Sequence, residues 1–289
     1  MKSSFITLNN GNKMPMQGFG TLQIKDAEVC EKCVYEAIKA GVRMFDTAPA
    51  YFNEEAVGKG IAKAIAEGLV TREELFIVTK LWIQDTPKNM VRAAVMESMR
   101  KLQVQYLDLY LIHQPYGSYL ESWPVMEQLV REGKLKNIGV CNFSKSKLEE
   151  LQKTAEVKPA VNQIEIHPYY LHKDLREYMA EQNIAPMAWG SLSEGQRGIF
   201  ENQDFRSIAQ KYGKSVAQVI LRWHLQRGVP AIPKSIHTEY IRENLDILDF
   251  EITEEEMNLI ESYDMGYSEI IDHNNPLTEK WLTEWKIHE

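Results

Sequence analysis

Four side chains in the first half of the sequence are of types that together could reduce a carbonyl group: Asp46, Tyr51, Lys80 and His113. Asp46 would hold the Lys80 ammonium beside Tyr51, and a neighbouring cation lowers the pKa of a phenol from its usual value of about 10. Tyr51 would then be a usable proton donor near neutral pH. His113 could donate to the same substrate oxygen as negative charge develops on it.

Each of these residues has an ordinary structural explanation when it is taken alone. An aspartate after a strand often caps a helix, a tyrosine in a loop usually packs, and a lysine is usually solvated. The chemistry therefore depends on a fold that brings the four side chains together. A second chemistry stays open, in which Lys80 is the Schiff-base nucleophile of a barrel aldolase.

The elements that must position these residues are short apolar runs that alternate with amphipathic stretches. Helical spacing is shown, for example, by Val91, Val95, Met99 and Leu102. Strand followed by helix, repeated eight times, predicts parallel βαβ units and a (β/α)8 TIM barrel. The C-terminal ends of its strands would carry the four polar residues on one face. The predicted strands lie at residues 18–22, 42–45, 75–78, 107–112, 138–140, 161–164, 186–189 and 231–233.

Other features support a barrel in a single domain spanning residues 1–289. A doubly wound sheet would need a GxGxxG turn after its first strand, and only Gly18-Phe19-Gly20 is present. Asn10-Gly11 predicts a two-residue turn in an N-terminal hairpin within residues 1–15. Helix starts are indicated by an N-cap at Thr86 before Pro87, and by three capping boxes that begin at Thr71, Ser215 and Thr253.

Residues 264–289 form a tail without clear core periodicity. The tail could close over the barrel mouth with Trp82 and Trp123, pack on the barrel flank or mediate a dimer contact. The expected substrate pocket comprises Trp82, Trp123, Leu22 and Gln114.

Composition excludes several classes of protein. The chain is 44% hydrophobic and 26% charged, and lacks both a secretory signal and an apolar run long enough to span a membrane, so a soluble cytoplasmic protein is expected. Three cysteines fit a reducing compartment. The net charge of −8 argues against nucleic acid as a partner. No metal is expected, since Cys30 and Cys33 lack a second pair and His167 and His172 lack helical ligand spacing.

Three motifs closely resemble the signatures of the aldo-keto reductase superfamily. They are residues 45–48 with Tyr51 and residues 53–54, then residues 79–82, then residues 108–113. The resemblance runs from about Gly18 to Asp264 and is greatest to the bacterial diketogluconate-reductase-like group. It matches the four residues above to the family's catalytic tetrad. It implies an enzyme that reduces aldehydes or ketones to alcohols and that is a monomer or a weak homodimer. The resemblance also allows an alternative, a cofactor-binding sensor whose reductase activity is vestigial.

The resemblance also implies a nicotinamide cofactor. Asn142 and Gln163 match the residues that hold the carboxamide, and Trp189 matches the aromatic side chain on which the ring stacks. Cys141 stands where the family more often has serine, and a thiol is a weaker hydrogen-bond partner. The resemblance extends the expected cofactor site to loop residues Gly20, Thr21, Leu22, Ser191 and Leu192.

Residues 232–235 and 243–244 resemble the family's segment for the adenosine 2′-phosphate and adenine. Lys234 can supply a point charge and Ser235 a hydrogen bond, and Glu243 and Asn244 complete the segment. Tyr240 stands where the family usually has arginine, so no bidentate ion pair can form there. We therefore expect NADPH as the favoured cofactor, with reduced discrimination against NADH.

Overall fold

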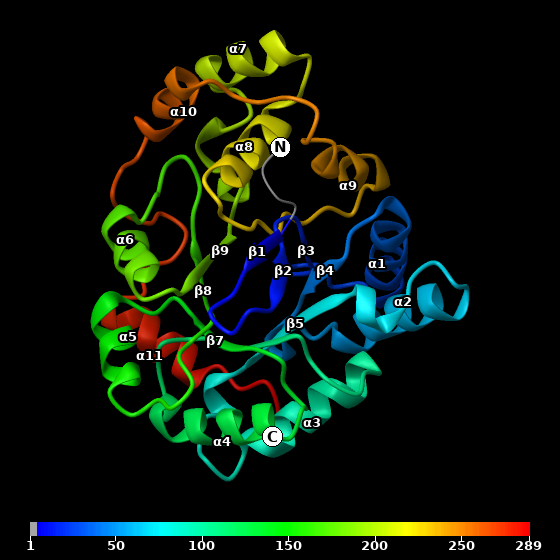
Figure 1. The fold of residues 1–289 in the computed structure, drawn as a ribbon, viewed down its shortest axis with the longest axis vertical. Coiled ribbons are helices and arrows are strands. Elements are labelled where there is room, and N and C mark those ends of the chain that lie inside the picture. Colours follow the sequence, from blue (N-terminus) through cyan, green and yellow to red (C-terminus); the bar gives the residue numbers. More distant parts are fainter. Residues whose placement is uncertain (1–4) are drawn as a thin grey trace.

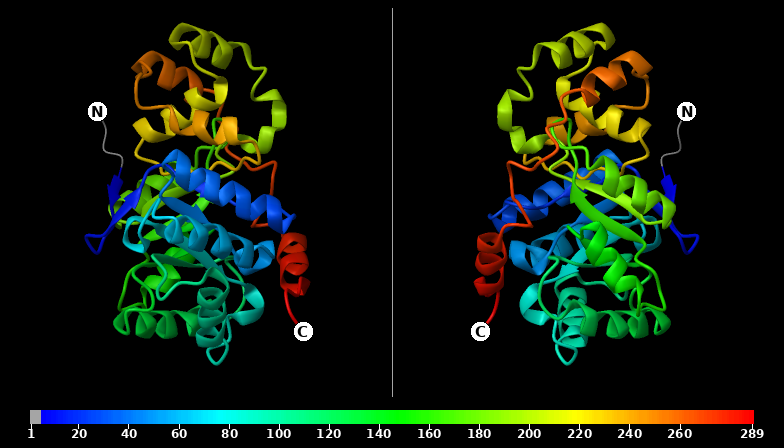
Figure 2. Two further views of the ribbon diagram at one scale, coloured as in Figure 1. Left: turned by 90° about the vertical axis from the view of Figure 1, so that its right-hand side faces the viewer. Right: turned by 90° about the vertical axis from the view of Figure 1, so that its left-hand side faces the viewer.

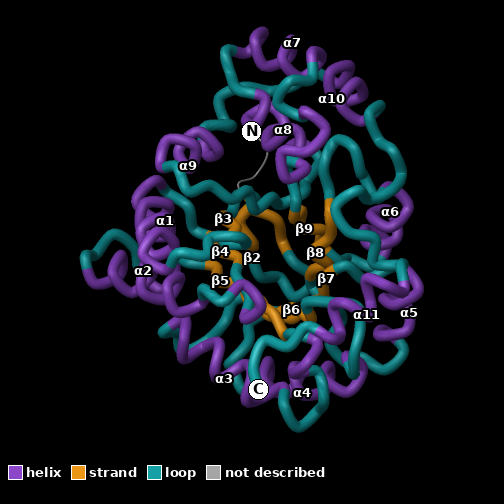
Figure 3. Tube along the Cα trace, turned by 180° about the vertical axis from the view of Figure 1, so that it is seen from behind, coloured by secondary structure: helices purple, strands orange, loops and turns teal. Residues whose placement is uncertain are grey.

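The computed structural model describes residues 5–289, in which parallel strands form the wall of a barrel. The ring of strands lies inside a layer of helices when it is seen from behind (Figure 3). The sheet runs in chain order from β3 to β9, and each strand pairs with the next in parallel. Its strands are β3 (Phe19–Gly20), β4 (Met44–Asp46), β5 (Phe76–Leu81), β6 (Leu109–Ile112), β7 (Ile138–Cys141), β8 (Val161–Glu165) and β9 (Ala185–Trp189).

The eighth predicted strand, at residues 231–233, is reduced to a bridge at one residue. Ala231 pairs in parallel with Gln17 on one side and with Ala188 of β9 on the other, which joins the two ends of the sheet. Pro230 and Pro233 flank this bridge and have no N–H to donate to a ladder. The (β/α)8 barrel is therefore confirmed, but its last strand is shorter than predicted.

Helices surround the barrel (Figure 1). The apolar spacing that predicted a helix at residues 91–102 is confirmed by α3, which buries Val91, Val95, Met99 and Leu102. The helices of the layer are α1 (Ala27–Ala40), α2 (Glu54–Ala66), α3 (Val91–Leu102), α4 (Tyr119–Arg131), α5 (Lys145–Gln152), α6 (Lys173–Glu181), α7 (Gln203–Tyr212), α8 (Val216–Gln226), α9 (Thr238–Leu245) and α10 (Glu254–Glu261). Short 3-10 helices are η1 (Pro49–Tyr51), η2 (Arg72–Glu74), η3 (Ile83–Asp85) and η4 (Ser193–Gly198).

The predicted N-terminal hairpin is confirmed as β1 (Phe5–Thr7) paired with β2 (Lys13–Pro15). Its turn is longer than the two residues predicted, because the paired strands end at Thr7 and Lys13. Gly11 still takes the left-handed φ of +88° that made Asn10-Gly11 a turn signal. Met14 of β2 packs with buried side chains of β4 to β7, so the hairpin covers the N-terminal end of the barrel.

The C-terminal tail lies at the opposite end of the barrel. In both side views the hairpin and α11 (Pro276–Glu284) are on opposite sides of the molecule (Figure 2). Leu282 of α11 packs against Ala50 and Trp82, which lie in loops after the C-terminal ends of β4 and β5. Of the three positions considered for the tail, the structure therefore supports the one over the barrel mouth.

Of the helix starts predicted from local sequence signals, the three capping boxes are confirmed and the N-cap at Thr86 is not. The capping boxes at Thr71, Ser215 and Thr253 are confirmed, the first on η2 and the others on α8 and α10. The predicted N-cap at Thr86 is wrong: Thr86 ends η3, and its hydroxyl donates to the Ile83 carbonyl at 2.8 Å. Within residues 5–289, none of the helices is long and apolar enough to cross a bilayer.

Candidate active site

A cavity of about 830 Å³ opens at the C-terminal end of the barrel. This volume is in the range of small-molecule sites. Its floor includes Asp46, Tyr51 and His113, so the fold brings three residues of the predicted tetrad to one cavity. The C-terminal tail forms part of its wall through Ile270, Ile271, His273, Trp281 and Trp285.

Lys80 lies beneath the cavity floor and links Asp46 to Tyr51. Its Nζ donates to Asp46 Oδ1 at 2.6 Å and lies 3.1 Å from the Tyr51 hydroxyl. A third bond, of 2.9 Å, goes to the Thr47 carbonyl. Lys80 is fully buried, so this cation depends on its three oxygen partners for solvation. The predicted association of Asp46, Lys80 and Tyr51 is thus present.

The protonation of this group differs from the prediction. Burial by itself would lower the pKa of Lys80, but the Asp46 carboxylate, followed by Tyr51, raises it above its ordinary value. For Tyr51, burial is the largest influence and raises the pKa to about 12, although Lys80 acts in the opposite direction. The predicted lowering of the Tyr51 pKa is therefore wrong for this structure, because desolvation of the phenolate outweighs the attraction of the cation. Tyr51 holds its proton at neutral pH.

His113 completes the floor as an uncharged imidazole. Burial, and next the charge of Lys80, lower the pKa of His113 well below its ordinary value. Its ring packs edge-on against Tyr51 at 5.6 Å and against Trp82 at 5.1 Å between centroids. Its Nδ1 is buried and has no hydrogen-bond partner among residues 5–289. A neutral, fixed ring beside the phenol is suited to donate one hydrogen bond to a substrate oxygen.

Asn53, which stands out in the sequence only as part of a motif, holds the loop that carries Tyr51. Its Oδ1 accepts from the Thr47 hydroxyl at 2.8 Å, and its Nδ2 donates to the Thr21 carbonyl at 2.8 Å. Thr21 was expected to bind the cofactor, but it is fully buried and its hydroxyl donates to the Asp46 carbonyl at 3.0 Å. Thr21 and Asn53 therefore brace the β3 and β4 loops from behind the cavity.

Asn142, Gln163 and Trp189 form a site that fits a carboxamide. The Trp189 indole donates to Asn142 Oδ1 at 2.7 Å, and Gln163 Nε2 donates to Asp46 Oδ2 at 2.7 Å. These bonds leave the Asn142 amide nitrogen with only a 3.5 Å contact to Gln114, and Gln163 Oε1 with a 3.9 Å contact to the Cys141 thiol. A donor and an acceptor are thus available together, as one amide group requires of another.

The remaining expected cofactor residues fall into two groups. The cavity is lined by Gly20, Leu22, Cys141, Ser191, Leu192 and Lys234. A Cβ at Gly20 would lie 2.6 Å from the Ile232 carbonyl oxygen, so glycine allows β3 to pack closely against the segment at Ile232. Ser235 lies just beyond, where its hydroxyl accepts from the His237 N–H at 3.0 Å. Tyr240, Glu243 and Asn244 lie on α9 outside the lining, and Tyr240 is 52% exposed.

Three of the four residues expected in a substrate pocket line the cavity: Trp82, Leu22 and Gln114. Trp123 does not, and its assignment is corrected: it is 1% exposed on α4, and its indole donates to the Val157 carbonyl at 3.0 Å. The aromatic wall comes instead from the tail. Trp285 packs edge-on against Trp82 at 5.4 Å, and its carbonyl accepts from the Trp82 indole at 2.9 Å.

The similarity of the chain to known proteins agrees with this geometry. A model of the aldo/keto reductase family matches residues 16–265. The chain is 46% identical to a glyoxal reductase of Bacillus subtilis over 258 residues, which is 89% of this chain and 91% of that protein. It is 42% identical to the methylglyoxal reductase DkgA of Escherichia coli O157:H7, covering 90% and 94% of the two chains. A Bombyx mori aldo-keto reductase, solved in complex with NADP, superposes with a TM-score of 0.88 at 37% identity, covering 94% and 96%.

Proposed function

Because the chain belongs to the aldo/keto reductase family, we propose that it reduces small aldehydes and ketones with NADPH and that Tyr51 is the proton donor. The observation that carries the proposal is the 3.1 Å contact between Lys80 Nζ and the Tyr51 hydroxyl, with Asp46 at 2.6 Å from the same nitrogen. This arrangement keeps a protonated phenol next to a fixed positive charge.

The bound cofactor would supply a hydride to the carbonyl carbon. Asn142 and Gln163 would orient its carboxamide, and Trp189 would support the ring. As the carbonyl oxygen gains negative charge, Tyr51 donates its proton to that oxygen and His113 donates a hydrogen bond. The phenolate left on Tyr51 is stabilised by Lys80, whose own charge is balanced by Asp46. A pKa of about 12 suits this role, since the phenol remains protonated until a more basic alkoxide forms.

We propose α-oxoaldehydes such as glyoxal and methylglyoxal as the first substrates to assay. Two relatives are named for reduction of these compounds and share 46% and 42% of aligned residues with the chain. Trp82, Trp281 and Trp285 line a cavity of about 830 Å³, and such an aromatic lining also suits larger apolar carbonyl compounds. Assays of a panel of aldehydes, ketones, keto acids and sugars, in which loss of NADPH absorbance measures the rate of reduction, would rank these substrate classes.

Replacement of Tyr51 by phenylalanine tests the assigned proton donor. We expect turnover to fall by about a hundredfold or more with nearly unchanged NADPH affinity, because only proton donation is removed. Steady-state kinetics and cofactor fluorescence titration measure the two effects. Tyr267→Phe, at a 53% exposed residue of the tail, is the matched control and should leave turnover unchanged. Unchanged turnover in Tyr51→Phe would end the proposal.

The aldolase alternative gains little support from the surroundings of Lys80. A Schiff-base lysine needs a neutral, accessible amine, whereas Lys80 is fully buried and bonded to Asp46, Thr47 and Tyr51. Borohydride reduction in the presence of substrate, followed by mass spectrometry, would detect a Lys80 adduct. Absence of NADPH oxidation with every substrate of the panel would instead favour the sensor alternative.

Cofactor preference is a separate prediction that rests on Lys234 and Tyr240. Lys234 lines the cavity and offers one positive charge, whereas Tyr240 has no charge with which to form a bidentate ion pair to a phosphate. We expect NADPH to be preferred over NADH by a modest ratio of kcat/KM, and Tyr240→Arg to increase that ratio about tenfold by adding a bidentate partner. A tenfold preference of the unmodified enzyme for NADH would overturn the cofactor assignment.

A further inference from the structure

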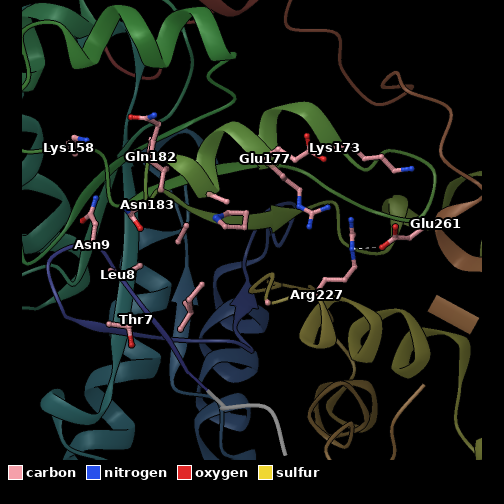
Figure 4. Close-up of a pocket in the computed structure, with 17 residues that line it drawn as sticks. Thr7, Leu8, Asn9, Lys158, Lys173, Glu177, Gln182, Asn183, Arg227 and Glu261 are labelled. Atoms are coloured by element: carbon pink, nitrogen blue, oxygen red, sulfur yellow. Dashed lines mark ion pairs between the residues drawn. The ribbon is translucent and has the colours of Figure 1, made fainter. Parts of the chain in front are cut away.

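A second cavity, of about 950 Å³, lies at the N-terminal end of the barrel strands. Its lining includes Lys158, three residues before β8, and Ala185, the first residue of β9. The active-site cavity lies at the other ends of these strands, where Gln163 and Trp189 are found. Figure 4 shows the second cavity between α6, the hairpin segment of Thr7 to Asn9, and Arg227 after α8.

The charged side chains of this cavity are predominantly basic. They comprise Lys158, Lys173, Arg176 and Arg227, with the carboxylates Glu177 and Glu261. The lining therefore has an excess of two positive charges in a chain whose net charge is −8. A cluster of cations in a cavity creates a local positive field that attracts anions, even though the net charge of the chain is negative.

The two arginines are only partly neutralised by the protein. Arg227 Nε pairs with Glu261 at 2.9 Å, and its side chain is 6% exposed. In the part of the chain that the structure describes, Nη1 of Arg227 and Nε of Arg176 are both buried and have no hydrogen-bond partner. Within the described chain, Arg176 makes no ion pair through its guanidinium, although Glu261 and Glu177 are near enough to influence it.

The electrostatic environment of Arg227 is consistent with this partial neutralisation. Burial, and next the charge of Arg176, lower the pKa of Arg227 to about 9. Burial likewise lowers the pKa of Arg176. Both guanidinium groups remain charged at neutral pH. Two charged guanidinium groups that repel each other, Arg227 largely buried and Arg176 partly so, would both be stabilised by one bound anion.

We propose that this cavity binds a small molecule through a phosphate group, with Arg176 and Arg227 as the residues that hold it. A phosphate monoester dianion would balance the excess of two positive charges, and the guanidinium fork matches phosphate oxygens. The cavity is much larger than a phosphate ion, and Asn9, Gln182 and Asn183 offer polar groups to the rest of a ligand. The inference concerns a site distinct from the reductase centre.

The test is isothermal titration calorimetry on the enzyme saturated with NADPH, so that its cofactor phosphate site is filled. Glycerol 3-phosphate and inorganic phosphate are the probes, and glycerol is the uncharged control. We expect saturable binding of a phosphate compound and none of glycerol. Tighter binding of glycerol 3-phosphate would identify an ester as the ligand, and equal binding would identify the free phosphate ion.

Arg176→Gln should weaken this binding by about ten- to hundredfold, as expected for loss of a hydrogen bond between charged groups. Arg176→Lys, which keeps the charge but loses the fork, should weaken it less. Because the Arg176 guanidinium makes no ion pair within residues 5–289 and is repelled by Arg227, neither variant should lower Tm. Arg131→Gln, at an exposed arginine of α4 paired with Glu156, is the matched control and should bind normally. Absence of saturable binding up to about 10 mM, or unchanged affinity in both Arg176 variants, would overturn the proposal.

Discussion

At the scale of single residues, the active site depends on one buried ion pair. The Lys80 and Asp46 side chains are 0% and 2% exposed, so each is stabilised mainly by the other and by nearby hydrogen bonds. Gln163 and Thr47 supply further bonds, which hold the pair in one geometry. The phenol of Tyr51 lines the cavity and lies 3.1 Å from the ammonium of the ion pair, so it can connect the pair to a substrate.

The protonation states of Tyr51 and His113 lead to a prediction about pH. As the proposed proton donor, Tyr51 must be in its protonated form, which predominates below its raised pKa of about 12. His113 is neutral above its pKa, which is well below the ordinary value. Neither group should therefore titrate in the enzyme between about pH 6 and about pH 9, and kcat for carbonyl reduction should be nearly flat in that interval. A bell-shaped profile with an apparent pKa near 7 that disappears in His113→Asn would contradict these assignments.

At the scale of secondary structure, α8 shows how local signals and burial combine. Ser215 caps its first turn, accepting from the Gln218 N–H at 3.2 Å, while the Gln218 side chain accepts from the Ser215 N–H at 3.0 Å. The Gln218 side chain also donates to the Asp246 carbonyl at 2.7 Å. The capping box thus fixes both the start of α8 and its contact with the segment after α9.

Ser215→Ala should destabilise the protein by about 1 kcal/mol, because the hydroxyl acceptor of the first turn is lost. Chemical denaturation followed by circular dichroism measures the change in the free energy of unfolding. Ser207→Ala on α7 is the matched control: this hydroxyl is exposed and donates to the Gln203 carbonyl of its own helix. Equal stability of the two variants would show that the cap contributes little. Reductase activity at low temperature should be unchanged in both.

At the scale of the whole molecule, the two ends of the barrel have different partners. The tail crosses the C-terminal end, where Tyr116 donates to the His273 carbonyl at 2.6 Å and Arg197 forms an ion pair with Glu269. The hairpin covers the N-terminal end, beside the basic cavity. The proposed reductase site and the proposed second site for a phosphate compound therefore lie at opposite ends of one barrel. A cytoplasmic location and a monomeric or weakly dimeric state stay predictions.

Leu282→Ala tests the contribution of the tail to substrate binding. Leu282 is 2% exposed and packs with Trp82 and Ala50, so its truncation should loosen α11 over the cavity. We expect KM for carbonyl substrates to rise by about tenfold, with little change in NADPH affinity. Leu277→Ala, on the same helix but 73% exposed, is the control. If both variants have the KM of the unmodified enzyme, the tail does not shape the substrate site.

Much of the fold and of the candidate site could be predicted from the sequence, because both follow from local patterns. The alternation of short apolar runs with helical spacing specifies a barrel, and chemistry on a barrel occurs at the C-terminal strand ends. Asp46, Lys80 and His113 could thus be placed together because each follows or ends a predicted strand. The capping boxes at Ser215 and Thr253 were equally local, since donor and acceptor are three residues apart.

Other properties were decided only by the tertiary structure. The wall of the cavity next to Trp82 comes from Trp285, more than two hundred positions away, whereas Trp123, which is equally aromatic, faces the core behind α4. The pKa of Tyr51 depends on how much protein surrounds its hydroxyl, and the repulsion between Arg176 and Arg227 depends on the meeting of α6 and the end of α8. Periodicity reports which side of an element is buried, but desolvation and charge at a site are set by distant segments that only folding brings together.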